Sequence, residues 1–138
     1  GMDHPDRPLT RRGRGRTQAV MEALVNRGVV LDRLISSPYR RAVETAQLAV
    51  QVGMAPQLEL DDRLSPGGSA PELLERLKGR VALVGHEPDL SELACELLGL
   101  APGRIRLKKA GLVLLHRAVH RWQLEALIRP GLLLEQQV

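Results

Sequence analysis

Short apolar runs alternate with longer amphipathic stretches along most of this chain, a pattern that predicts strands alternating with helices. The clearest run is 81–84, four aliphatic residues in a row, which is too short for a helix and cannot continue through Pro88. We therefore expect a buried strand that ends abruptly. Leucines spaced three and four apart over 89–98 predict an amphipathic helix directly after it, which Gly99 is expected to end. This pattern puts His86 at the carboxyl end of a strand and beside a helix N-terminus, where ligands bind in open α/β sheets.

The amino-terminal third predicts one helix followed by a strand–loop–helix unit. Residues 1–9 are polar and proline-rich and predict a loop. Thr10 is a suitable N-cap for a helix over 10–26. A short strand is expected at 31–35, and the next helix at 39–52.

The rest of the chain has weaker signals. Ser69 and Glu72 have the spacing of a capping box, which predicts a helix from 69 to about 78. The other expected elements are a short strand at 57–60, an irregular stretch at 61–68, strands at 104–117 and 122–129, and a turn at 118–121. Together the elements predict one α/β domain over 1–138, with three layers: helices flank a mostly parallel sheet that ends in an antiparallel hairpin.

The composition narrows the choice of partners. The 138 residues include no Phe, one Trp and one Tyr, so aromatic platforms for single-stranded nucleic acid are nearly absent, and no apolar run could span a membrane. The net charge of +4 comes from scattered arginines, which form either a solvated basic surface or a field that favours anionic ligands. The single Cys95 cannot form an internal disulfide, which favours a cytoplasmic protein. We expect no nucleic-acid and no membrane partner.

Two predicted strand ends carry the residues that could act chemically. The first end carries Ser36, Ser37, Arg40 and Arg41, and the second carries His86. Because the carboxyl ends of neighbouring parallel strands face one crevice, these side chains can meet. Arginine forks and a helix N-terminus suit phosphate oxygens, so together they predict a cationic phosphoryl pocket. Taken singly, each arginine could instead be solvated and His86 could be structural.

The sequence lacks the residues that other phosphoryl-transfer enzymes and metal sites need. A cysteine phosphatase needs an Arg six residues after its Cys, and the residue at that distance from Cys95 is Ala101. The sequence has no Gly-rich Walker loop and no His, Cys and Asp cluster with metal-ligand spacing, so we expect no cofactor and no metal. Glu44 and Glu87 are expected at the surface or in salt bridges.

Two stretches resemble signature motifs of the histidine phosphatase superfamily. They are Ser-Ser-Pro-Tyr-Arg-Arg-Ala-Val-Glu-Thr-Ala at 36–46 and Val-Gly-His-Glu-Pro-Asp-Leu-Ser at 84–91. The branch they resemble most is that of the small SixA-type phosphohistidine phosphatases. The resemblance covers most of residues 5–100 and implies a phosphoglycerate-mutase-like fold.

The resemblance also implies roles for individual residues. Arg41, which precedes Ala42 in the Arg-Ala-x-x-Thr pattern, would grip the phosphoryl oxygens. His86 would hydrogen-bond the phosphoryl group as charge develops, and Ser37 is expected as a further phosphate contact. The implied reaction is metal-independent dephosphorylation of phosphohistidine in a partner protein.

One family motif does not occur in this sequence. The family's nucleophile is a histidine in an Arg-His-Gly motif at the end of the first strand, and the 138 residues contain no Arg-His-Gly. His4 lies in a predicted loop and is a poor substitute. A covalent phosphohistidine intermediate needs that imidazole, so we expect this chain to be inactive or severely impaired. The alternative is a non-catalytic module of the same fold that binds phosphate or a phosphoprotein.

A missing first central strand would also leave a slot in the sheet, with unpaired backbone groups on either side. One explanation is that the sequence begins at an internal methionine. Another is that a different strand fills the slot, either 132–134 or an edge of a second chain through strand exchange or dimerisation.

Overall fold

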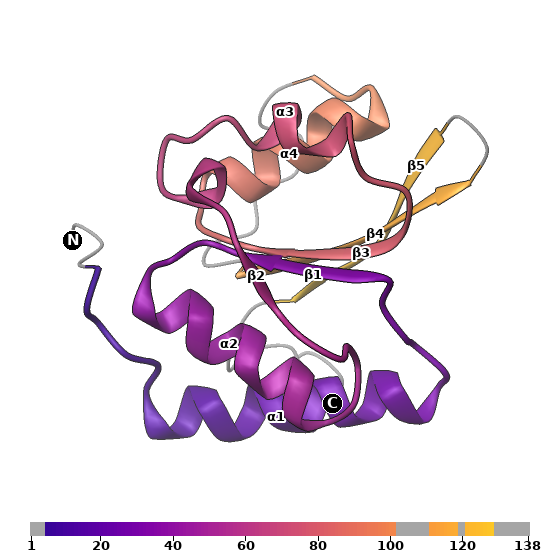
Figure 1. Cartoon of the computed structure of the whole chain (residues 1–138). Helices are drawn as coiled ribbons and strands as arrows, with labels where there is room; N and C mark the ends of the chain where they lie inside the picture. The colour runs from indigo at the N-terminus through magenta and orange to yellow at the C-terminus, as the bar shows by residue number, and fades with distance from the viewer. Residues whose placement is uncertain (1–4, 102–110, 119–120, 129–138) are drawn as a thin grey trace.

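The structure, a computed structural model, describes residues 5–101, 111–118 and 121–128 of the chain. Helices and strands alternate through most of this length (Figure 1). In chain order the elements are α1 Arg11–Asn26, β1 Arg33–Ser36, α2 Arg40–Gln51, β2 Glu59–Leu60, the 3₁₀ helix η1 Asp62–Leu64, α3 Ala70–Leu74, β3 Gly79–Val84, α4 Asp89–Leu98, β4 Leu112–Ala118 and β5 Arg121–Ile128.

The strands form one mixed sheet in the order β2-β1-β3-β4-β5. β1 pairs in parallel with both β2 and β3, and the pairs β3–β4 and β4–β5 are antiparallel, so only β4 runs against the others. Helices α1 and α2 cover one face of the sheet, and α3 and α4 cover the other (Figure 1). These three layers confirm the predicted α/β fold and its C-terminal hairpin.

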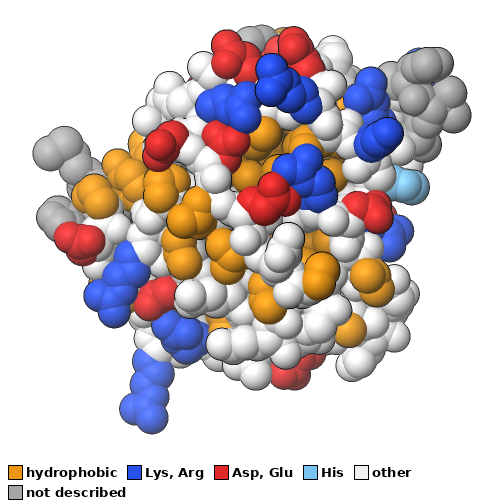
Figure 2. Space-filling model, viewed as in Figure 1, with side chains coloured by type: hydrophobic (Ala, Val, Ile, Leu, Met, Phe, Trp, Pro, Cys, Tyr) orange, Lys and Arg blue, Asp and Glu red, His pale blue; other side chains and the backbone are white. Residues whose placement is uncertain are grey.

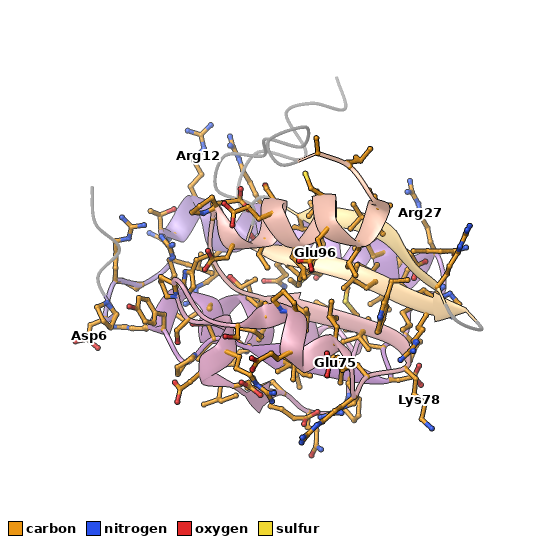
Figure 3. The ribbon with its side chains drawn as sticks, turned by 90° about the horizontal axis from the view of Figure 1, so that it is seen from above. Asp6, Arg12, Arg27, Glu75, Lys78 and Glu96 are labelled. Carbon is orange, nitrogen blue, oxygen red and sulfur yellow. The ribbon has the colours of Figure 1, made fainter. Side chains whose placement is uncertain are left out.

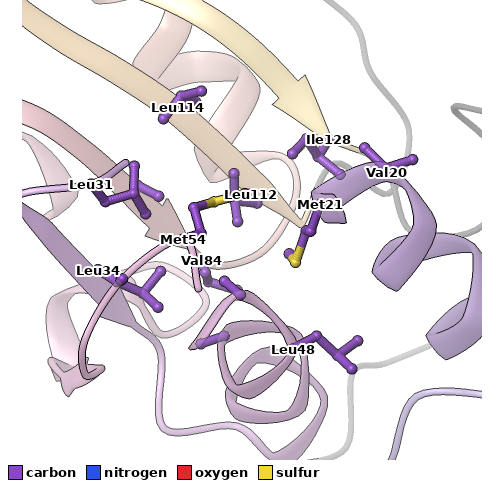
Figure 4. Packing of buried hydrophobic residues seen from close by; sticks show 14 of the residues in the cluster. Val20, Met21, Leu31, Leu34, Leu48, Met54, Val84, Leu112, Leu114 and Ile128 are labelled. Atoms are coloured by element: carbon purple, nitrogen blue, oxygen red, sulfur yellow. The ribbon is translucent and has the colours of Figure 1, made fainter. Parts of the chain in front are cut away.

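Alternating side chains of the central strands build two cores. Ala82 and Val84 of β3 belong to the cluster beneath α1 and α2, part of which is drawn in Figure 4. Val81 and Leu83 belong to the cluster beneath α3 and α4. Successive strand residues point to opposite faces, so a strand buried on both faces is aliphatic throughout. This explains why 81–84 is a continuous apolar run.

Local signals predicted three helix termini, although the capping bond expected at one of them does not form. Thr10 caps α1, and its hydroxyl accepts the backbone N–H of Gly13 at 3.0 Å. Gly99 ends α4 in a left-handed conformation, with φ 69°. The predicted capping box at Ser69 does not form, because the backbone there (φ −95°, ψ 60°) is not the extended one that aims a capping hydroxyl at the helix. Helix α3 begins after Ser69 as predicted and ends at Leu74, short of the predicted 78.

The strands differ from the predicted ranges mainly at their ends. β1 starts and ends slightly later than 31–35, β2 shortens to two residues, and β3 begins at Gly79. Part of the predicted strand at 104–117, and part of the turn at 118–121, lie outside the described residues.

The expected slot in the sheet is absent among the described strands. β3 hydrogen-bonds directly to β1 on one side and to β4 on the other, so each interior strand has a partner along both edges. The described strands thus form one continuous sheet without the expected gap. The segment 132–134 lies outside the described residues, and strand exchange or dimerisation stays a prediction.

Candidate active site

The two motif-bearing strand ends lie side by side. Ser36 pairs with Val84 in the β1–β3 register, and the Ser37 backbone N–H continues this pairing by donating to the Val84 carbonyl at 2.8 Å. Figure 3 places Asp6 at one end of the molecule and Lys78, just before β3, at the other. β3 therefore leads the chain toward the Asp6 end, where Ser37 and His86 meet.

His86 contacts both predicted partners. Its Nε2 lies 2.8 Å from the Ser37 hydroxyl oxygen, and its Nδ1 lies 3.2 Å from Nη2 of Arg41. His86 is 2% exposed and Ser37 is fully buried, so protein groups surround the ring. The structure thus brings together the three residues to which the sequence assigned phosphate binding.

The first turn of α2 carries Arg41 to this position. Tyr39 is the N-cap of α2, and its backbone N–H donates to the Ser37 hydroxyl at 3.1 Å. The buried Thr45 hydroxyl donates to the Arg41 carbonyl at 2.9 Å one turn later. The Tyr39 ring packs edge-on against His86, with 4.8 Å between ring centroids. Sequence reasoning missed this ring contact, because nothing in the motif says where the Tyr39 side chain turns.

The other two members of the predicted pocket have different partners. Arg40 lies 3.5 Å from the Glu44 carboxylate, which also faces Arg14 at 3.1 Å. The Ser36 hydroxyl donates to the Ser37 carbonyl at 2.8 Å. Of the four residues expected at the first strand end, the structure therefore brings only Ser37 and Arg41 to His86, and the salt-bridge role expected for Glu44 is confirmed.

Glu87 follows His86 but serves the next helix. Its carboxylate accepts the backbone N–H of Ser91 at 2.9 Å and also contacts the Ser91 hydroxyl. Burial raises the pKa of Glu87 above the usual glutamate value, although the bonds from Ser91 act in the opposite direction. Glu87 therefore stabilises the start of α4, beside the site.

Asp61 places a second carboxylate near the site, and sequence reasoning did not identify it. The Asp61 backbone N–H donates to the Ser36 carbonyl at 2.9 Å, which ties the loop after β2 to the site end of β1. Both Asp61 carboxylate oxygens accept from the Arg63 guanidinium, at 3.0 and 2.8 Å, and these bonds lower the pKa of Asp61. The Asp-x-Arg spacing at 61–63 was the available signal.

The part of the chain that the structure describes shows neither a metal-ligand cluster nor a membrane-spanning helix. There, no three His, Cys, Asp or Glu side chains are arranged to hold a metal ion. None of the helices in that part is long and apolar enough to cross a membrane. Figure 2 shows lysines and arginines spread over the visible face and interspersed with acidic side chains. At the site itself, Arg41 offers a guanidinium and His86 an imidazole, groups suited to oxyanions.

Known proteins share both the sequence and the fold. A family model described as histidine phosphatase superfamily (branch 1) matches residues 2–66. An uncharacterized protein from Picosynechococcus sp. is 33% identical over 126 residues, which cover 86% of this chain and 76% of the relative.

Solved structures of SixA proteins have the same phosphoglycerate-mutase-like fold. SixA from Agrobacterium tumefaciens superposes with a TM-score of 0.72 at 21% identity, covering 95% of this chain and 88% of that one. The protein histidine phosphatase SixA complexed with tungstate gives 0.70 at 19% identity, covering 94% and 88%. The motifs at Arg41 and His86, the family model and the 33% identical relative agree, and the chain belongs to the histidine phosphatase superfamily.

Proposed function

We propose that this protein is a metal-independent phosphohistidine phosphatase that acts on a phosphorylated partner protein, with Arg41 and His86 binding the phosphoryl group. Membership of the superfamily supports a phosphatase reaction in general. One observation carries the finer proposal: Nη2 of Arg41 lies 3.2 Å from Nδ1 of His86, although the residues are 45 positions apart. A phosphoryl group beside Arg41 would therefore also lie beside the imidazole.

The charges around these two groups favour an oxyanion. A guanidinium can make two parallel hydrogen bonds to phosphate oxygens, and the first turn of α2 adds the positive end of a helix dipole. That first turn contains no acidic residue, and the nearby carboxylate of Glu87 is engaged by Ser91. The sequence also predicts Ser37 as a phosphate contact. In the structure its buried hydroxyl contacts His86 Nε2 and the Tyr39 backbone N–H, so it lies behind the ring.

The chain between the two motifs supports a protein substrate. Residues 46–85, all of which the structure describes, form the rest of α2 and then β2, η1, α3 and β3. This stretch contributes to the sheet and its helices and leaves no separate lid domain over the site. A site that residues 46–85 leave uncovered by a lid domain suits a phosphorylated side chain on another protein better than a small metabolite that must be enclosed.

The 138 residues by themselves lack the residue expected to attack phosphorus. They contain no Arg-His-Gly, and His86 is the family's second histidine by its motif. We therefore predict that this chain binds phosphate and turns over phosphohistidine little or not at all.

The same observation favours one alternative, a non-catalytic module that binds phosphate or a phosphoprotein through Arg41 and His86. The DNA sequence upstream of the Met2 codon distinguishes the two functions. An in-frame segment upstream of the Met2 codon, encoding an apolar strand that ends in Arg-His-Gly, favours the enzyme, and its absence favours the module.

Phosphate release from a histidine-phosphorylated protein tests the proposal. The 138-residue chain should release little phosphate, whereas a version extended by the Arg-His-Gly strand should be active in the presence of a metal chelator. Activity of the extended form should disappear in His86→Ala. Robust release by the 138-residue chain that His86→Ala abolishes would contradict the predicted inactivity, and an inactive extended form would favour the binding module.

A further inference from the structure

Protein groups hold both ring nitrogens of His86, and the two contacts define where its proton lies. A guanidinium only donates hydrogen bonds, so the 3.2 Å contact of Arg41 Nη2 requires a lone pair at Nδ1 of His86. A neutral imidazole with a lone pair at Nδ1 carries its proton at Nε2. Nε2 therefore donates to the hydroxyl oxygen of Ser37, 2.8 Å away.

The surroundings of Ser37 suit it to accept this proton. Its hydroxyl oxygen also accepts the backbone N–H of Tyr39 at 3.1 Å, and an oxygen with two lone pairs can accept both bonds. Ser37 is 0% exposed and His86 2%, so bulk water does not compete for either group. The pairing of Ser37 N–H with the Val84 carbonyl fixes the serine backbone to the strand that leads to His86.

We propose that Ser37 is a positioning residue: it accepts the Nε2 proton of His86 and holds the ring so that Nδ1 faces Arg41. This inference rests on the proposed function, in which a phosphoryl group lies against Arg41 and hence on the Nδ1 side of the ring. Nδ1 is then the ring nitrogen on the side of the phosphoryl group. Nε2 keeps its own proton on Ser37, which thus acts through His86.

Nitrogen-15 NMR of the ring tests this arrangement on the 138-residue chain, with His86→Gln identifying the signals. At about pH 9, where histidine rings are neutral, His86 should carry its proton on Nε2, and that proton should exchange slowly with water. Ser37→Ala should speed the exchange by about tenfold or more, because a buried donor loses its acceptor. The matched control is Ser36→Ala, since Ser36 is equally buried but its hydroxyl donates to a carbonyl. In Ser36→Ala the Nε2 proton of His86 should exchange as in the wild type.

Sulfate binding gives a second readout. A general loss of packing would weaken binding equally in Ser37→Ala and Ser36→Ala, because the two serines are equally buried. Ser37→Ala should weaken sulfate binding by about tenfold and Ser36→Ala by less than about twofold. A wild-type ring protonated at Nδ1, or an Nε2 proton whose exchange is unchanged in Ser37→Ala, would overturn the inference. Failure of the wild-type chain to bind sulfate would instead overturn the proposed function, because the NMR readout needs no anion.

Discussion

The carboxylate of Glu44 accepts a hydrogen bond from the backbone N–H of Leu9, 35 residues earlier, at 2.7 Å. The same carboxylate faces Arg14 at 3.1 Å and Arg40 at 3.5 Å, and its side chain is only 13% exposed. Glu44 thus joins the segment before α1, α1 itself and α2, one turn from Arg41. It is a structural anchor for the helix that presents Arg41.

We expect Glu44→Gln to lower the free energy of unfolding by about 1–3 kcal/mol, because it presents an amide NH₂ to two guanidinium groups in a half-buried position. Urea unfolding measures this loss. Glu59→Gln is the matched control: Glu59 pairs with Arg33 at a more exposed site (38%), so its loss should stay below about 1 kcal/mol. Equal losses in the two variants would mean that Glu44 is an ordinary surface partner.

The half-buried Glu87 predicts a pH dependence of the free energy of unfolding. Its pKa is raised in the folded chain, chiefly by burial, whereas in the unfolded chain it is near the ordinary value of about 4.3. Between these two values the folded state binds more protons, so the free energy of unfolding contributed by Glu87 falls as pH rises. In urea unfolding, the free energy of unfolding of the wild type should therefore fall relative to that of Glu87→Gln as the pH rises. A pH-independent difference would contradict the raised pKa.

For Asp61 the predicted change of stability with pH has the opposite sign. The hydrogen bonds from Arg63 lower its pKa in the folded chain below the unfolded value of about 3.9. Its contribution to stability is complete above the unfolded pKa and is lost as pH falls through the folded one. The advantage of the wild type over Asp61→Asn should thus be present at about pH 6 and shrink below about pH 4. Arg63→Gln should show the same pH dependence, because it removes the hydrogen bonds that lower the pKa of Asp61. A different pH dependence in Arg63→Gln would contradict the assignment of that lowered pKa to Arg63.

Sequence reasoning succeeded where the signal is local or follows from strand direction. Thr10 and Gly99 mark helix ends because capping depends on neighbouring residues. The meeting of Ser37, Arg41 and His86 follows from a general rule, since carboxyl ends of parallel strands share one edge.

It failed where the outcome depends on contacts between distant segments. The predicted pocket included both Arg40 and Arg41, whereas the Arg-Ala-x-x-Thr pattern singled out Arg41 alone. In the structure Arg40 pairs with Glu44, and Arg41 contacts His86 across 45 positions of the chain. Direct pairing of β3 with β4 removed the expected slot, because strand order is a property of the whole sheet. The backbone at Ser69 likewise overrode a good capping-box pattern.

The most direct test of the account is phosphate binding by two neighbouring arginine variants of the 138-residue chain. Arg41 and Arg40 are adjacent in α2, but only Arg41 contacts His86, whereas Arg40 pairs with Glu44. Isothermal titration with inorganic phosphate should show binding that Arg41→Gln weakens by about tenfold or more, the usual contribution of a charged hydrogen-bond donor, and that Arg40→Gln changes by less than about threefold. Equal weakening in both variants, or unchanged binding in Arg41→Gln, would contradict the assignment of the phosphoryl site to Arg41 and His86.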